Sequence, residues 1–259
     1  MQNPPADMGP HYQGGYDPIP QTLTELRAIA AKEDYRIAPI LKHKTSGRYL
    51  EIGPWRGVAC CGMKDAGFEV TALEMSYPCV NFLRDTVGIA AIQSSDPAET
   101  MKNLEPGFDV IAAWHSMEHI PEPWLVIQRA SQLLAPGGIL LLAMPNPESY
   151  EFSVMKSAWL HLDAPRHLHF FRLKTLENVC RANGLSPLEI TTDDELSGIL
   201  GKDAWYYWAR SWIPVRYLRG AVASVVGPIL YRSAYKKQKI EGCGSGYTAI
   251  FIKTEIQPR

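Results

Sequence analysis

The stretch from Arg48 to Gly57 constrains this chain most, because it joins an apolar segment to a tight glycine turn. Its sequence, RYLEIGPWRG, predicts a buried strand, a turn that Gly53 and Gly57 permit, and a helix that begins at Val58. Glycines let a backbone approach a ligand closely, and the amides at the start of a helix point towards it. The pattern is typical of a nucleotide-binding corner in an α/β protein.

A second apolar segment, residues 69–74, strengthens this interpretation because it ends in an acid. Glu74 lies 21 residues after Gly53 in the sequence. A carboxylate at the end of a neighbouring parallel strand can accept hydrogen bonds from both ribose hydroxyls of a nucleoside. We therefore expect Glu74 to bind a ribose.

Segments of strand and helix character alternate along most of the chain, and this predicts a Rossmann-like, doubly wound, mostly parallel sheet of seven strands. The expected strands are the segment before the glycine turn and residues 69–74, 89–92, 108–114, 139–144, 185–191 and 246–253. The expected helices are residues 22–41, 58–66, 79–86, 122–134 and 173–183.

The same pattern suggests four segments. Residues 1–21 are rich in proline, glycine and polar residues, which predicts a flexible N-terminal arm. Within it, Tyr12 and Tyr16 either pack on the surface or belong to a flap over a bound ligand. Residues 22–195 form the core, residues 196–244 a helical cap inserted before the last strand, and residues 245–259 that strand and a tail.

Composition bounds the class of protein. Hydrophobic residues make up 46% of the chain, enough for a large core, and the net charge of −1 favours no nucleic acid partner. No basic-then-apolar leader and no membrane-spanning run is evident, and the five scattered cysteines fit neither a zinc site nor a disulfide framework. We expect a cytoplasmic protein with reduced thiols.

Four motifs in this order resemble those of class I S-adenosylmethionine-dependent methyltransferases. They are the glycine loop at 51–57, the acid Glu74, the segment WHSMEHIP at 114–121 and the turn LLAPGGIL at 133–140. The segment DAPRHL at 163–168, followed by Phe170, is similar to one in a bacterial subgroup that includes enzymes acting on quinone precursors and secondary metabolites. The resemblance covers residues 48–192 and implies S-adenosylmethionine as cofactor.

The resemblance also implies a cofactor site at the carboxyl edge of the sheet. One position departs from the family pattern, because Trp55 stands where a second glycine is expected and could either wall the cofactor or mark a loop that no longer binds it. The residues expected to bind the cofactor are Glu51, Gly53, Pro54, Trp55, Gly57, Glu74, Met75, Ser95, Asp96, Trp114 and His115.

Methyl transfer to an oxygen needs a base for the hydroxyl proton, and a histidine near this edge is the natural choice. We expect His167 to be this catalytic base, with His119 as the second candidate. Each could instead be a structural histidine bonded to a backbone carbonyl. An alternative is a metal site of His161, His167 and His169 with Glu118 or Asp163, but the spacing is unspecific, and the prediction is that no metal binds.

The predicted cap is rich in aromatic residues, at Trp205 to Trp208 and Trp212, and it is also basic. Between residues 202 and 239 it holds eight basic residues and one acid. This composition suits a lid over the substrate, a homodimer interface or a peripheral membrane contact, and the lid is our prediction. The expected acceptor is a small or amphipathic molecule, methylated at oxygen. The rival interpretations are a cofactor-binding pseudoenzyme that acts as a partner subunit, and a nicotinamide-dependent reductase.

Overall fold

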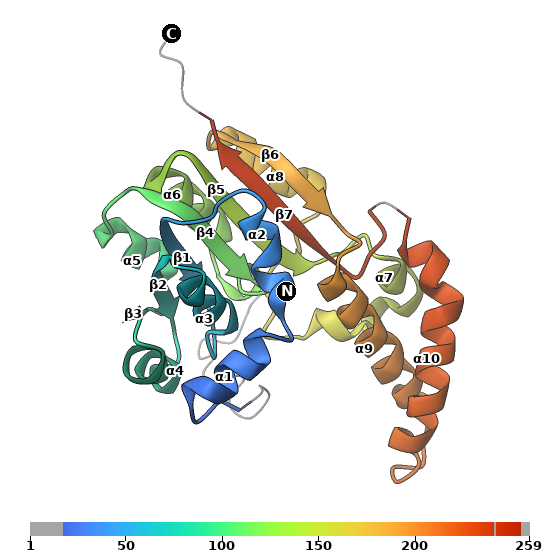
Figure 1. Cartoon of the computed structure of the whole chain (residues 1–259). Coiled ribbons are helices and arrows are strands. Elements are labelled where there is room, and N and C mark those ends of the chain that lie inside the picture. Colours follow the sequence, from blue (N-terminus) through green and yellow to red (C-terminus); the bar gives the residue numbers. More distant parts are fainter. Residues whose placement is uncertain (1–17, 241, 255–259) are drawn as a thin grey trace.

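The computed structural model describes residues 18–240 and 242–254, so Tyr12 and Tyr16 of the predicted arm lie outside the described residues. Seven strands form one sheet in the order β3-β2-β1-β4-β5-β7-β6 (Figure 1). Strand β7 runs antiparallel to β5 and β6, and the other neighbours are parallel, which confirms the predicted doubly wound sheet. The strands are β1 (Arg48–Ile52), β2 (Glu69–Glu74), β3 (Ala90–Gln93), β4 (Phe108–Trp114), β5 (Leu134–Pro145), β6 (Leu185–Thr191) and β7 (Gly246–Lys253).

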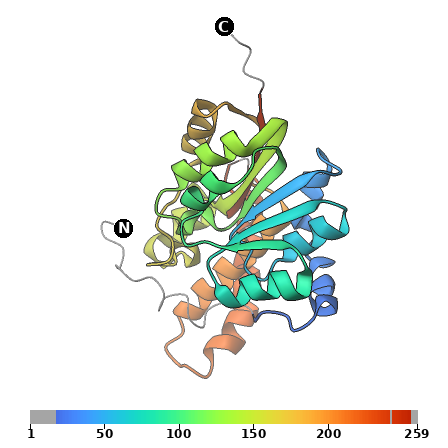
Figure 2. The ribbon, with the colours of Figure 1, turned by 90° about the vertical axis from the view of Figure 1, so that its left-hand side faces the viewer.

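Helices cover both faces of the sheet, as the views from two sides show (Figures 1 and 2). One face carries α1 (Leu23–Ala30), α2 (Ala38–Leu41), α3 (Val58–Asp65) and α4 (Tyr77–Phe82), whose buried side chains join one hydrophobic cluster. The other carries α5 (Pro97–Thr100), α6 (Pro123–Leu133) and α8 (Leu173–Ala182), which pack around a second cluster. Ligands of such sheets bind beyond the carboxyl ends of the strands, where the loops meet.

Three predicted boundaries were wrong. The helix expected at 22–41 is interrupted into α1, a short 3-10 turn at residues 34–36, and α2, where Pro39 cannot donate the hydrogen bond that a continuous helix needs. The helix expected at 79–86 begins at Tyr77 and passes into a π-helical turn at residues 83–87. Strand β5 begins at Leu134, which pairs with Phe108 before the register shifts.

The segment between β5 and α8 was not predicted to hold helices. It contains α7 (Tyr150–Met155) and short 3-10 turns at residues 156–158 and 160–162. Each is too short to display a helical repeat of apolar residues, which explains why no periodic pattern marks it.

The insertion before β7 forms two helices, α9 (Glu195–Ser211) and α10 (Arg219–Gln238), which lie side by side and extend away from the sheet (Figure 1). We call residues 195–238 the hairpin. Its base has a hydrophobic core of its own, in which Trp205 and Ala234 pack against Met155 and Trp159. Among the described residues, no helix combines the length and apolar character that crossing a membrane requires.

Candidate active site

A cavity of about 590 Å³ lies at the carboxyl ends of β1, β2 and β4. Most of the residues predicted to bind a cofactor line it. They are Glu51, Gly53, Pro54, Trp55, Glu74, Met75, Ser95, Trp114 and His115. Gly57 and Asp96 are not among the described residues that line the cavity.

The turn after β1 is tied to both neighbouring strands. The amide of Gly53 donates to the carbonyl of Leu73 in β2 at 2.8 Å, and Ser116 Oγ, after β4, donates to the carbonyl of Ile52 at 2.7 Å. Gly53 has a φ of 67°, and a Cβ atom there would lie 2.7 Å from the Cβ of Ser116. Only glycine fits this close approach, as the sequence predicts.

Trp55 adopts a backbone conformation that favours glycine. Its φ is 53°, in the left-handed region that bulky residues rarely adopt. The amide of Trp55 donates to Glu74 Oε2 at 2.8 Å, which holds the turn in this conformation. The turn therefore survives the loss of the second glycine, and the tryptophan side chain becomes part of the cavity wall.

Gly57 serves the fold behind the cavity. It has a φ of 78° and stands at the N-terminus of α3. A Cβ atom there would lie 2.3 Å from Leu83 Cδ2, so glycine lets the helix start pack against the π-helical turn. The predicted direct contact with a cofactor stays a prediction, although the contact with Leu83 explains the glycine by itself.

Two buried carboxylates lie at the ends of adjacent strands. Glu74 accepts from the amides of Trp55 and Ser76, each at 2.8 Å, while Glu51 accepts from the Tyr49 hydroxyl at 3.0 Å and the Cys60 thiol at 2.9 Å. Burial raises the pKa of both carboxyl groups, and these hydrogen bonds offset part of that rise. Both acids are thus held in place by donors of the protein itself.

The remaining predicted residues divide between the cavity and the surrounding structure. Asp96 caps α5 by accepting from the amide of Glu99 at 3.1 Å, and Ser95 beside it lines the cavity. Trp114 is buried at the end of β4, and its Nε1 has no hydrogen-bond partner among the described residues. A donor left unpaired in the wall of a cavity is a place for an acceptor on a ligand.

A second cavity of about 300 Å³ adjoins the first. The two share His115, His119 and Leu200, and the second also contains Glu118 and His167. Glu118 is fully buried, and one ligand atom from each of Glu118, His119 and His167 lies within 4.8 Å of the others. We call these three residues the Glu-His-His cluster. It brings together the two predicted catalytic histidines, whose ring centroids are 4.7 Å apart.

Backbone carbonyls set the tautomers of both histidines. Nδ1 of His167 lies 2.7 Å from the carbonyl of His161, and Nδ1 of His119 lies 3.1 Å from the carbonyl of Arg166. Because a carbonyl only accepts, each Nδ1 must carry the proton, and Nε2 of the neutral ring is a proton acceptor. Each histidine therefore bonds a backbone carbonyl through Nδ1, as a structural histidine does, and also has in Nε2 an atom that can accept a proton in catalysis.

Burial controls the protonation of the cluster. It lowers the pKa of His167, although the charge of Glu118 opposes this shift. For Glu118, burial by itself would raise the pKa, but His115, with Nδ1 at 3.3 Å from Oε1, and the charges of His119 and His167 outweigh it, so the pKa is lowered. Glu118 is thus held as an ionised carboxylate, and it lies beside the His167 imidazole, whose neutral form burial favours.

Of the metal ligands considered from the sequence, Glu118 and His167 come together, whereas His161, His169 and Asp163 do not belong to the same group of possible ligands among the described residues. His169 contributes Nε2 to the carbonyl of Pro121 at 2.8 Å and packs edge-on against Trp124. Burial lowers the pKa of His161 to about 4, and its Nε2 lies 3.3 Å from the carbonyl of Leu200. Among the described residues, the donors close enough to share a metal ion are instead those of the Glu-His-His cluster.

Several residues of the cavity wall were not predicted from the sequence. Arg36 lines the larger cavity, and its guanidinium lies 5.9 Å from the ring centroid of Trp114. The sequence prediction placed it in a continuous helix over residues 22–41, and Pro39, which favours the first turn of a new helix, was the signal that could have revealed the interruption. Leu196 and Leu200, in the first turns of α9, also line the larger cavity.

The predicted lid contributes to the cavities through the start of α9, and its lid role stays a prediction. The aromatic residues from Trp205 to Trp212 are not among the described residues that line either cavity. They lie further along α9, beyond the turns that reach the site, because the hairpin extends away from the sheet (Figure 1). Among the described residues of the hairpin, Leu196 and Leu200, at its base, are those that line a cavity.

Comparison with known proteins agrees with this geometry. The methyltransferase domain family matches residues 25–190. A ubiquinone biosynthesis O-methyltransferase from Paraburkholderia phymatum is 28% identical over 165 residues, which cover 57% of this chain and 68% of the relative. The protein of the same name from Pseudomonas aeruginosa is 31% identical over 131 residues, 48% of this chain and 56% of the relative. The chain thus spans about half to two thirds of the length of these relatives.

A solved structure extends the likeness across the fold. A SAM-dependent methyltransferase from Archaeoglobus fulgidus superposes with a TM-score of 0.59 at 18% identity, covering 88% of this chain and 96% of that one. This similarity supports the fold, while the family match covers the strands and loops that build the larger cavity. The chain therefore belongs to the methyltransferase domain family, as a class I S-adenosylmethionine-dependent methyltransferase.

Proposed function

We propose that this chain methylates an oxygen atom of a small or amphipathic acceptor, which binds in the smaller cavity beside the cofactor. The names of the relatives support oxygen as the acceptor atom. The observation that carries the proposal is the Glu-His-His cluster at the boundary of two adjoining cavities, in which Glu118 and His167 are buried and His119 is partly buried. It supplies a proton acceptor where the cofactor and acceptor would meet.

The residues of the larger cavity fit S-adenosylmethionine. Glu74 is the acid for the ribose, since it lies at the end of β2 in the cavity wall and the backbone amides that it accepts hold its carboxylate in place. Arg36 offers a positive charge to the carboxylate of the methionine moiety, and the unpaired Trp114 Nε1 offers a donor. Met75 and Ser95, which follow β2 and β3 and line the same cavity, would contact the adenine side.

When bound, S-adenosylmethionine would supply the methyl group of its sulfonium. The acceptor oxygen would form a bond to the methyl carbon, and the sulfur would keep the electron pair of the carbon–sulfur bond that breaks. His167 accepts the hydroxyl proton of the acceptor at Nε2, while its Nδ1–H remains bonded to the carbonyl of His161. Glu118 stabilises the imidazolium that results, because an ionised carboxylate lies beside it in a buried site. His119 is the second candidate for the same role.

Substitution of His167 tests this role. His167→Gln removes the proton acceptor, and general-base contributions are typically about 10²–10⁴-fold, so kcat should fall in that range. The assay measures S-adenosylhomocysteine formed with a panel of soluble phenols and catechols. Cofactor affinity by calorimetry should stay within about twofold, because His167 is not among the described residues lining the larger cavity.

The matched control is His43→Gln, which changes a half-buried histidine that pairs with Glu189 at 3.1 Å. Normal turnover in this control and loss in His167→Gln would support the base. Equal turnover in His167→Gln and wild type would reject it. A chain that binds S-adenosylmethionine but methylates none of the panel would favour the pseudoenzyme.

The same turnover assay tests the prediction from the sequence that no metal binds. Incubation with a chelator followed by dialysis is expected to leave turnover unchanged. Loss of activity that returns with magnesium, manganese or zinc would contradict this prediction and would identify the Glu-His-His cluster as ligands.

A further inference from the structure

The outer half of the hairpin is not needed to build the site. Its inner faces are already packed: a Cβ atom on Gly227 of α10 would lie 2.8 Å from the Cα of Tyr206, so the two helices are in close contact. The base is anchored to α7 through Met155. The end remote from the sheet, residues 212–218 and the first turns of α10, therefore has surface left over for another partner (Figure 1).

That surface is apolar and exposed. Trp212 and Tyr217, in the connection between the helices, are 53% and 85% exposed. Along α10 and the residue before it, exposed aliphatic side chains recur at intervals of four, three and four residues, which places them on one face of the helix. These are Leu218, Val222, Val225 and Ile229. We call these six residues the apolar surface.

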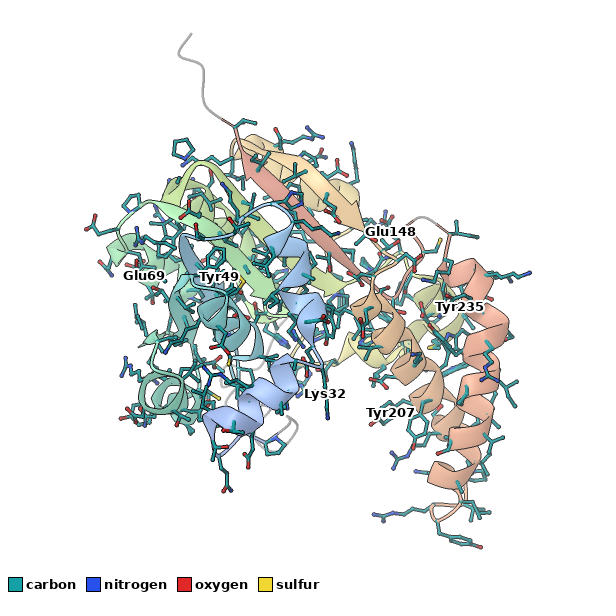
Figure 3. All side chains as sticks on the ribbon, in the orientation of Figure 1. Lys32, Tyr49, Glu69, Glu148, Tyr207 and Tyr235 are labelled. Atoms are coloured by element: carbon teal, nitrogen blue, oxygen red, sulfur yellow. The ribbon has the colours of Figure 1, made fainter. Side chains whose placement is uncertain are left out.

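Isolated apolar residues on a surface are ordinary, but six large exposed apolar residues on one projecting element mark an interaction site. Side chains drawn as sticks surround the hairpin on its outer sides (Figure 3). Labelled Tyr207 and Tyr235 lie on α9 and α10, nearer the core than the connection. The apolar surface therefore belongs to the outer end of a hairpin whose sides also carry aromatic residues.

The charge around the apolar surface has one sign. Residues 204–240 contain seven basic residues and no acidic one. Arg210 and Arg216 are exposed beside the connection, and Arg232 and Lys236 continue the exposed face of α10 at the next intervals of three and four. A second copy of the chain would bring like charges together without an acid to pair them, which disfavours a homodimer through this face.

We propose that the apolar surface docks on a membrane that contains anionic lipids. Tryptophan and tyrosine prefer the interface between water and lipid, aliphatic side chains enter the acyl boundary, and arginine and lysine attract anionic headgroups. Because no described helix could span a membrane, the contact is peripheral.

Docking also gives the hairpin a role at the site, in an inference that rests on the proposed function. Leu200, in the same helix that leads to Trp212, lines both cavities. A docked hairpin would hold these cavities at a set position relative to the lipid. The acceptor would then be an amphipathic molecule that partitions into the membrane and reaches the smaller cavity from it.

Vesicle flotation of the full chain tests the docking. We expect binding to vesicles of phosphatidylcholine with about one third phosphatidylglycerol, and little binding to phosphatidylcholine alone. The triple variant Trp212→Ser, Tyr217→Ser, Leu218→Ser should lose at least about tenfold in partitioning. Arg216→Gln should lose about fivefold, and added salt should weaken binding of the wild type.

Matched controls lie on the core. Leu188→Ser changes a leucine on β6 that is 41% exposed, against 43% for Leu218, and Lys174→Gln removes an exposed cation on α8. Both should bind vesicles like wild type, while the single variant Leu218→Ser should bind less. Calorimetry with S-adenosylmethionine verifies that every variant is folded, independently of any methyl transfer.

Three results would overturn the docking. One is a wild type that does not float with anionic vesicles. Another is equal flotation of Leu218→Ser and Leu188→Ser. The third is a dimeric mass by light scattering that the triple variant reduces to a monomer. Failure of methyl transfer to all acceptors, with flotation intact, would instead reject the proposed function and leave the docking supported.

Discussion

At the carboxyl edge of the sheet, polar side chains are buried and bonded to the backbone, whereas on the outer hairpin large apolar side chains face outwards. Glu74 receives two amides and is nearly inaccessible, while Tyr217 is 85% exposed. The first region has arranged its polar groups before a ligand arrives, which lowers the cost of binding a small molecule. The second leaves apolar area uncovered, which is suited to a broad surface. The two regions are therefore suited to different kinds of partner.

The largest expected effect concerns Glu74. Glu74→Ala removes the carboxylate that holds Trp55 and Ser76 and that we assign to the ribose. Hydrogen bonds to charged groups contribute about 1.5–3 kcal/mol each, so affinity for S-adenosylmethionine should fall at least about tenfold. Calorimetry measures the loss. The control is Glu69→Ala, an exposed acid at the opposite end of the same strand (Figure 3). Equal affinities of the two variants for S-adenosylmethionine would show that Glu74 does not bind the ribose.

A smaller effect, on stability, is expected at Glu51. Burial raises the pKa of this carboxyl in the folded state, so its contribution to stability is complete below the unfolded pKa and is lost as pH rises through the folded pKa. Glu51→Gln keeps an oxygen for Tyr49 and Cys60 without the charge. The variant should therefore gain about 1–2 kcal/mol over wild type between pH 4 and pH 7.

Urea denaturation at both pH values measures this difference. The control is Glu69→Gln, whose exposed carboxyl should give no such change between the two pH values. A Glu51→Gln variant that becomes less stable than wild type as pH rises would contradict the sign of the effect. A gain in stability for Glu51→Gln but not for Glu69→Gln would show that the buried charge of Glu51 lowers the stability of the protein.

Substitutions of Trp55 distinguish the effect of its backbone strain on stability from the effect of its side chain on cofactor binding. Its positive φ costs about 1 kcal/mol in a residue other than glycine, so Trp55→Gly should be about 1 kcal/mol more stable than Trp55→Ala by urea denaturation. Both variants lose the side chain that lines the cavity, and both should bind S-adenosylmethionine several-fold more weakly than wild type. Cofactor binding should change tryptophan fluorescence in wild type more than in either variant. Titrations identical to wild type would place the side chain away from the cofactor.

The smallest effect is expected on the hairpin. Val225→Ser with Ile229→Ser changes only exposed positions, so stability should shift by less than about 1 kcal/mol and cofactor affinity should not change. Ala223→Leu, on the buried face of the same helix, should cost about 1–3 kcal/mol by overpacking. If the exposed pair were as costly as Ala223→Leu, the outer face would be covered by the protein itself, and the contrast between the two regions would fail.

Much of the fold follows from local sequence. The expected strands at 69–74, 108–114, 185–191 and 246–253 match β2, β4, β6 and β7 at both ends, because apolar runs bounded by glycine, proline or polar residues specify them. The cofactor edge follows as well. Gly53, Glu74 and Trp114 end three neighbouring parallel strands, so sheet topology alone brings them to the same edge.

Features that depend on distant contacts were not predictable. Arg36 lies in the 3-10 turn that separates α1 from α2 and from there lines the cavity, and Gly57 is explained by its contact with Leu83. His119 and His167 were each selected from the sequence, but nothing local indicated that they would meet beside a fully buried Glu118.

The sequence by itself determined the sheet, the glycine turn and the acid at its edge, because hydrophobic period and backbone freedom act over a few residues. The tertiary structure alone decided how the segment from Tyr150 to Phe170 folds over the strand ends and which way the hairpin points. Those outcomes depend on packing between Trp159, Trp205 and their neighbours, residues far apart in the chain. Non-local packing of this kind leaves no periodic pattern in the sequence, so only the folded chain reveals it.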